Sequence, residues 1–232
     1  MRGISGETAR RRPTSFVLMR RHVTKFLRSL GSRKNVALAR LGAWWEGTGI
    51  RLGRGIRFYQ ATRLCGDGTI RIGDRTTIGY PIGGGFASSR CELQARLPEA
   101  VIAIGSAVGI NNGFLAIAVR NVTIGDRCLI GKDVQILDFD AHGVDPDERR
   151  SSSGRVSPVV LGENVWVGND AIILKGVRIG RNSIVAAGSV VTGGEYPEDS
   201  IVGGNPARVI GSVRVRAEKR PEDETDVAVH DD

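Results

Sequence analysis

One histidine, His142, follows closely on two carboxylates. Asp140 and Asp138 lie two and four residues before it, in the stretch LDFDAH. An imidazole can accept a proton from an alcohol near neutral pH, and a neighbouring carboxylate can fix its tautomer and stabilise its charged form. The sequence therefore predicts a general base at His142. Asp138 or Asp140 either orients the ring or has only a loop-capping role, and the sequence favours neither.

The position of His142 is set by an apolar repeat that ends just before it. Aliphatic residues fall six positions apart at Ile130 and Ile136, and His142 takes the next place. The repeat resumes at Leu161, and the residues between are rich in Asp, Glu, Arg, Ser and Gly. Exposed loops on rigid scaffolds commonly carry function. We therefore predict that residues 137–160 form an excursion loop that leaves the core, with His142 at its exit.

The six-residue period covers most of the chain and indicates its fold class. Its clearest members are Leu161, Val167, Ile173, Ile179, Val185 and Val191. A period of six is typical of a hexapeptide β-solenoid, in which each hexapeptide forms one strand and one turn and three close a triangular coil. A β-sandwich would show a period of two instead. We expect an all-β solenoid with Gly or Asn at corners that need positive φ.

This pattern resembles the hexapeptide-repeat acyltransferases over about residues 50–211. The segment GENVWVGNDAIILKGVRIGRNSIVAAGSVVT, followed by IVGGNPARVIG, is similar to the terminal coils and closing loop of the sugar O-acetyltransferases. That subgroup includes the galactoside, maltose and exopolysaccharide acetyltransferases. The resemblance implies a left-handed parallel β-helix and transfer of acetyl from acetyl-CoA to a sugar or polysaccharide-precursor hydroxyl, with His142 as base. It also implies a homotrimer with active sites completed between subunits.

The resemblance also assigns residues to the coenzyme. Small residues are expected where the pantetheine arm runs along a groove between subunits, an amide where the thioester oxygen becomes negative, and two further residues near the nucleotide. These positions are Gly168, Asn169, Ala187, Gly188, Thr192 and Arg208. On the acceptor side, Asn111 or Asn112 matches a substrate-contacting asparagine. The alternative for this pair is a simple corner asparagine in the left-handed conformation.

Other functions are compatible with the fold to different degrees. A zinc-dependent carbonic anhydrase needs three histidines at its site, whereas His142 alone lies among the repeats, so we reject it. An antibiotic or amino-sugar acceptor stays open, as does a non-enzymatic scaffold, which would not require the His142 loop. The scattered cysteines Cys65, Cys91 and Cys128 lack zinc-ligand spacing and form no disulfide framework. We expect no metal requirement and a cytoplasmic location.

The net charge of +8 is concentrated at the N-terminus, where residues 1–40 hold eleven Lys or Arg and one acidic residue, Glu7. Residues 14–30 predict a basic amphipathic helix with an apolar stripe at spacings of three and four. Its apolar residues are Phe16, Met19, Val23, Phe26, Leu27 and Leu30. The helix either packs on the body or a neighbouring subunit, or lies peripherally on an anionic membrane. No base-reading motif accompanies the charge, so nucleic acid is not an expected partner.

These features divide the chain into three predicted parts. Residues 1–49 form the basic segment with its helix. Residues 50–211 form the β-helix acyltransferase domain, including the excursion loop. Residues 212–232 are acidic and are expected to be a disordered tail.

Overall fold

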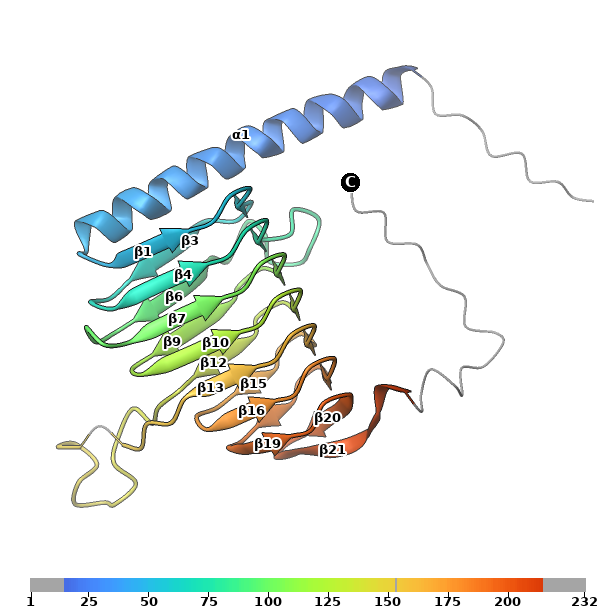
Figure 1. Cartoon of the computed structure of the whole chain (residues 1–232). Helices are drawn as coiled ribbons and strands as arrows, with labels where there is room; N and C mark the ends of the chain where they lie inside the picture. The colour runs from blue at the N-terminus through green and yellow to red at the C-terminus, as the bar shows by residue number, and fades with distance from the viewer. Residues whose placement is uncertain (1–14, 153, 215–232) are drawn as a thin grey trace, which may run out of the picture.

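The computed structural model describes residues 15–152 and 154–214; within its helix, the side chains of residues 15–22 and 25 are outside the description. Short parallel strands wind around three faces of a solenoid, and one long helix lies across its N-terminal end (Figure 1). The prediction of an all-β, left-handed parallel β-helix is confirmed. The segment before residue 15 and most of residues 212–232 fall outside the described part of the chain.

Three sheets form the faces of the solenoid, which we call faces A, B and C. Face A contains β1 (Gly49–Leu52), β4 (Thr69–Ile72), β7 (Val101–Ile104), β10 (Asn121–Ile124), β13 (Val159–Leu161), β16 (Val177–Ile179) and β19 (Gly194–Tyr196). Face B contains β2 (Arg57–Phe58), β5 (Thr77–Ile78), β8 (Gly109–Ile110), β11 (Leu129–Ile130), β14 (Trp166–Val167), β17 (Ile184–Val185), β20 (Ser200–Gly204) and β21 (Ala207–Ser212). Face C contains β3 (Thr62–Cys65), β6 (Cys91–Ala95), β9 (Leu115–Ala118), β12 (Gln135–Leu137), β15 (Ile172–Ile173) and β18 (Val190–Val191).

The six-residue period corresponds to one face per hexapeptide. Leu161, Val167 and Ile173 end strands on faces A, B and C in turn, and all three side chains are buried. Leu161 pairs in register with Ile179 on the next coil, and Val167 with Val185. Each coil in this region therefore takes three hexapeptides, and the aliphatic residues stack into a continuous core, as the sequence predicts.

The glycines that follow these aliphatic residues allow close packing between coils, whereas the positive φ expected of corner glycines is found at others, such as Gly176 and Gly188. A Cβ at Gly180 would lie 2.6 Å from the Cα of Glu198, and one at Gly162 would lie 2.7 Å from the Arg181 nitrogen. The left-handed residue comes two positions after the glycine, for example Asn182 with φ 59°. The expectation of asparagine at such corners is confirmed there.

Replacing Gly180 by alanine should lower the free energy of unfolding by about 1–3 kcal/mol, because the new methyl group overlaps the backbone of the next coil. Gly31 is the matched control. It lies in the helix with open space around it, so Gly31→Ala should be neutral or stabilise by about 0.5–1 kcal/mol. Thermal unfolding of both variants checks this. Equal melting temperatures for the two variants would contradict the packing role of Gly180.

The helix α1 (Ser15–Trp45) continues well past the predicted end at residue 30. Its second half is held by the first coil. The Ser32 hydroxyl accepts the Phe58 N–H at 2.9 Å, and the Asn35 side chain donates to the Phe58 carbonyl at 2.9 Å. Ala39 and Ala43 are buried against the solenoid. Over the described residues, no helix is both long and apolar enough to cross a bilayer.

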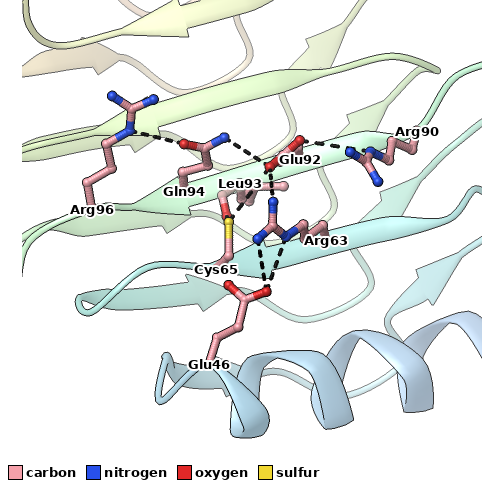
Figure 2. A network of polar contacts seen from close by, with 8 residues as sticks. All are labelled: Glu46, Arg63, Cys65, Arg90, Glu92, Leu93, Gln94 and Arg96. Atoms are coloured by element: carbon pink, nitrogen blue, oxygen red, sulfur yellow. Dashed lines mark hydrogen bonds and ion pairs between the residues drawn. The ribbon is translucent and has the colours of Figure 1, made fainter. Parts of the chain in front are cut away.

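A polar network fixes the C-terminal end of α1 (Figure 2). The Arg63 guanidinium, from β3, pairs with Glu46 just beyond the helix and with Glu92 on β6, each at 3.0 Å. The chain of contacts continues along face C from Glu92 to Gln94 and from Gln94 to Arg96. Together with the hydrogen bonds that Ser32 and Asn35 form with the first coil, this network sets which side of α1 faces the solenoid.

The solenoid ends in a hairpin. β20 continues face B, and β21 turns back along it in the antiparallel direction, with Gly204 paired to Ala207. The sequence GNPAR therefore forms the turn that terminates the solenoid. Beyond β21, Arg214 pairs with Asp199 at 3.0 Å.

Candidate active site

Two corners of the solenoid carry the candidate residues. The B–C corner comprises the turns from face B to face C at residues 59–61, 79–90, 111–114, 131–134, 168–171 and 186–189. The C–A corner comprises the turns from face C to face A at residues 66–68, 96–100, 119–120, 138–158, 174–176 and 192–193. The excursion loop belongs to the C–A corner, from which it projects (Figure 1).

The excursion loop has a paired base. Phe139 and Val156 form an isolated antiparallel bridge, and the Asp140 N–H donates to the Arg155 carbonyl at 2.9 Å. His142 lies just beyond this base, and its side chain is exposed. The interrupted repeat thus corresponds to a segment that leaves the solenoid and holds His142 outside its wall.

Asp138 is fully buried, and its carboxylate binds the backbone of the preceding coil. It accepts hydrogen bonds from the N–H groups of Val119, Arg120 and Asn121, at 2.8, 2.7 and 2.6 Å. These donors lie in and just after the turn between β9 and β10. A carboxylate that is bonded in this way has little capacity left for the His142 ring. Of the two roles that the sequence left open, the contacts of Asp138 correspond to capping and not to orientation of His142.

Asp140 is paired with Lys175, a residue that the sequence analysis missed. The Lys175 ammonium lies 2.6 Å from Asp140 Oδ1, and the two side chains are 27% and 30% exposed. Lys175 is in the turn after β15, one coil further along the same corner. The loop breaks the regular count of residues between coils, so the sequence offers no signal that would align these two positions. The pair ties the base of the loop to the solenoid.

The backbone of His142 packs closely against the other arm of the loop, whereas its ring has no hydrogen-bond partner among the described residues. A Cβ at Gly154 would overlap the His142 carbonyl oxygen, so this glycine lets the two arms of the loop approach each other. Among the described residues, none forms a hydrogen bond with the imidazole of His142, and Asp140 is engaged with Lys175. Any group that orients the ring must therefore come from a ligand or from outside the described part of this chain.

The small residues assigned to the coenzyme lie on the B–C corner. Gly168 and Asn169 follow β14, while Ala187 and Gly188 follow β17 one coil later. A Cβ at Gly168 would lie 2.5 Å from the Ala187 nitrogen, so the coils can stack closely here. Asn169 Oδ1 accepts the Lys132 N–H at 2.8 Å, which leaves its NH₂ group to donate elsewhere. This corner therefore presents little side-chain bulk and one amide donor.

Asn112 is not available to an acceptor, which corrects one of the two predicted substrate contacts. Its side chain is fully buried. The amide oxygen accepts the Tyr80 N–H at 2.9 Å, and the NH₂ group donates to the carbonyls of Tyr80 and Gly84 at 2.9 and 3.2 Å. Asn111 is half-buried and accepts the Asn112 N–H at 2.7 Å. Neither asparagine is left-handed, because Gly113 carries the positive φ of this turn, 75°.

Thr192 and Arg208 lie toward the C-terminal end of the solenoid. The Thr192 carbonyl accepts the Tyr196 hydroxyl at 3.2 Å, and its own side chain is half-buried. Arg208, on β21, is exposed and donates to the Ala207 carbonyl at 2.8 Å. No carboxylate among the described residues pairs with Arg208, so its charge is available to an anionic ligand.

A single chain does not bring these groups together. His142 and Lys175 are on the C–A corner, whereas Asn169 and Ala187 are on the B–C corner. β15 crosses face C between Asn169 and Lys175, and at about 3.3 Å per residue this separates them by up to roughly 20 Å. The two halves of the candidate site can therefore meet only if the B–C corner of one copy lies beside the C–A corner of another.

An exposed apolar pair lies next to the B–C corner and was also missed by the sequence analysis. Leu129 and Trp166 are register partners on the outer side of face B, with 58% and 53% of their surfaces exposed. Trp166 immediately precedes Val167 and Gly168 along the chain. Large exposed apolar side chains in adjacent positions are a common mark of a protein interface.

The thiols and metal-binding groups contribute no further candidate within the described residues. Burial raises the pKa of the Cys65 and Cys91 thiols to about 11 and also raises the pKa of Cys128. All three are consequently poor nucleophiles. In the part of the chain that the structure describes, no three His, Cys, Asp or Glu side chains are grouped as a metal site would need.

Comparison with known proteins identifies related sequences. A family model for bacterial transferase hexapeptides (six repeats) matches residues 158–193, and one for the hexapeptide repeat of succinyl-transferase matches residues 121–144. A putative lipopolysaccharide biosynthesis O-acetyl transferase of Escherichia coli is 32% identical over 172 residues, which cover 66% of this chain and 80% of the relative. The galactoside O-acetyltransferase of Escherichia coli is 34% identical over 125 residues, 51% of this chain and 61% of the relative.

The relatives differ in how much of their own length this chain covers. The chain spans 50–61% of the length of four curated relatives, the galactoside enzyme among them. Among solved structures, a hexapeptide-repeat acetyltransferase from Vibrio cholerae in complex with acetyl coenzyme A is similar, with a TM-score of 0.50 and 27% identity. That similarity covers 82% of this chain and 88% of the other.

Proposed function

The chain belongs to the hexapeptide-repeat acetyltransferase family, and we propose that it is an acetyl-CoA-dependent O-acetyltransferase acting on a sugar or polysaccharide-precursor hydroxyl. The observation that carries this proposal is the excursion loop, which holds exposed His142 at one corner of the solenoid while the neighbouring corner is lined by small residues such as Gly168 and Ala187. A scaffold would have no need of such a loop.

In the proposed reaction, His142 acts as the general base. It takes the proton of the acceptor hydroxyl as the oxygen attacks the thioester carbonyl carbon, and a C–O bond forms. The tetrahedral oxyanion then collapses, the C–S bond breaks, and the coenzyme A thiolate receives the proton from His142. The products are the acetylated acceptor and free coenzyme A. A positioned base of this kind typically contributes about 10²–10⁴-fold in rate.

The B–C corner supplies the proposed coenzyme site. The Asn169 carbonyl oxygen accepts a backbone N–H, which orients the amide, and its NH₂ group has no acceptor among the described residues, so it would donate to the oxyanion. The pantetheine arm would run over Gly168, Ala187 and Gly188, where the backbone can approach it. Arg208, which pairs with no carboxylate among the described residues, would bind the coenzyme phosphates, with Thr192 near the same end. Asn111, the half-buried member of its pair, would contact the acceptor.

We further propose that the active unit is a homotrimer with one site at each interface. Two arguments support this. The base and the coenzyme groove are on different corners of one chain, so a head-to-tail interface is needed to join them, and such an interface generates a ring when its rotation closes. The exposed pair Leu129 and Trp166 lies beside the groove, where a neighbouring subunit would cover it.

Subunit sharing predicts complementation between two inactive variants. His142→Ala removes the base, and Ala187→Glu places bulk and negative charge in the groove; both positions are exposed, so both variants should fold. When the two are unfolded and refolded together, about one quarter of the interfaces should combine an intact base with an intact groove, because each interface draws one half from each subunit. Turnover of the mixture should recover to about that fraction. A mixture that stays inactive would contradict a shared site.

The activity is tested by incubating the full chain with acetyl-CoA and a panel of acceptors: neutral sugars, nucleotide sugars, amino sugars and antibiotics with free hydroxyls. Released coenzyme A is followed with a thiol-reactive dye, and the acetylated product is identified by mass spectrometry. The enzyme's own thiols should react slowly, because burial raises the pKa of Cys65 and Cys91 to about 11. Acetylation of a sugar hydroxyl supports the proposal. Transfer to amines alone would show that the acceptor group is an amine and not a sugar hydroxyl. The absence of transfer to every acceptor would favour a non-enzymatic scaffold.

A further inference from the structure

The helix α1 presents two different sides. The inner side is small and polar, with Ser32, Asn35, Ala39 and Ala43 in contact with the first coil. The ion pair between Glu46 and Arg63 fixes the end of the helix (Figure 2). Because these contacts set the rotation of the helix about its axis, the opposite side is directed away from the solenoid.

That opposite side, which we call the outer face of α1, is apolar. Its members are all at least 45% exposed, and Trp45 reaches 81%. They are Val23, Phe26, Leu27, Leu30, Leu38, Leu41, Trp44 and Trp45. At 100° per residue they fall within an arc of about 120°, roughly opposite Ala39. Eight large apolar side chains exposed on one face of a helix indicate an interaction site.

The charged residues of α1 from Val23 to Trp45 are all positive. At 100° per residue, Arg33 and Arg40 flank the outer face, Lys34 lies within its arc, and Arg28 lies on the side of Ala39. Arg28, Arg33, Lys34 and Arg40 are exposed. No ion pair joins these four cations to any carboxylate among the described residues. The one acidic group at the end of the helix, Glu46, is already paired with Arg63.

We propose that the outer face of α1 docks on the surface of an anionic lipid bilayer. Helices that lie in a membrane interface combine a face of Trp, Phe and Leu with Lys and Arg beside it, as this one does. Tryptophan favours the headgroup level, which suits the exposed Trp44 and Trp45. A second copy docked through its own outer face fits less well, because that face would bring the same cations and no acidic residue.

The place of the helix on the solenoid suits a flat surface. α1 lies across the N-terminal end, so its outer face points away from the coils (Figure 1). In a cyclic trimer built along the solenoid axis, three such faces lie at the same end. The docking face differs from the segment 14–30 expected from the sequence, because it continues to Trp45 and its described part begins at Val23.

Vesicle co-sedimentation of the full chain tests the proposal. We expect binding to vesicles of phosphatidylglycerol mixed with phosphatidylcholine, much weaker binding to phosphatidylcholine alone, and a decrease with added salt. The double variant Leu41→Glu and Trp45→Glu should bind at least tenfold more weakly. The matched control, Ile82→Glu with Leu97→Glu, makes the same charge change at exposed apolar positions of the solenoid and should bind like the unmodified chain.

Two outcomes would overturn the proposal. Equal binding by the two double variants would exclude the outer face as the contact. If light scattering shows a lipid-independent association that the helix variant abolishes, the occupant is a second copy. Acetyl transfer to a soluble acceptor is measured on the same samples: the helix variant should keep its turnover. A chain that binds vesicles and transfers no acetyl group would contradict the proposed function and leave the docking proposal intact.

Discussion

Replacing His142 by alanine should lower kcat by about 10²–10⁴-fold, the contribution of a positioned general base. The affinity for acetyl-CoA should not change, because its proposed contacts at Gly168, Ala187 and Arg208 come from other parts of the chain. The melting temperature should also stay the same, since the side chain is exposed and forms no hydrogen bond with the described residues. Turnover and coenzyme affinity should be measured on one sample.

Asp145→Asn is a suitable control for the His142 experiment. It changes an exposed residue of the same loop and should leave kcat within about twofold of the unmodified enzyme, as surface changes usually have small effects. Near-normal turnover of His142→Ala would remove this residue from the mechanism. Loss of turnover together with loss of coenzyme binding would make His142 a binding residue.

Asp138→Ala should produce the largest change in stability among the loop residues, about 2–4 kcal/mol. The substitution removes the charged acceptor of three backbone N–H groups, and unsatisfied donors cost about 1–3 kcal/mol each when buried. The expected loss is near the lower limit for three donors, because water can reach the N–H groups in the partly exposed turn at Arg120 and Asn121. For a chain of this size the melting temperature should fall by about 5–15 °C. Calorimetry or circular dichroism would measure it.

Asp140→Ala provides the contrast to this experiment. Its pair with Lys175 is partly exposed, so its loss should lower the free energy of unfolding by less than about 1 kcal/mol. If Asp138 instead acted through His142, then Asp138→Ala would lose activity at an unchanged melting temperature. That result would contradict the capping role inferred from its three backbone hydrogen bonds.

The sequence by itself determined the solenoid and the exit of the loop. A side chain that recurs every six residues reaches the same interior position on successive faces, so spacing alone predicts that Leu161, Val167 and Ile173 are in the core, where they lie. The break at position 142 was equally readable, because a polar insertion in such a repeat has to leave the coil. These features depend on local spacing, which a sequence records directly.

The tertiary structure decided the roles of individual polar residues. Asp138 binds backbone groups 17–19 residues earlier, and Lys175 meets Asp140 from 35 residues later. Those distances along the chain are set by loop lengths that follow no period. Likewise, the sequence allowed Asn112 to be a substrate contact, whereas its amide is buried among backbone groups of the turn at Tyr80.

The end of α1 and the direction of its apolar side also required the structure. The apolar stripe at spacings of three and four ends at Leu30, so the sequence predicted that the helix ends there. Packing of Ala39 and Ala43 on the first coil accompanies its continuation to Trp45. The inner side needs small residues to approach the solenoid closely, and the large apolar residues are consequently left on the outer face.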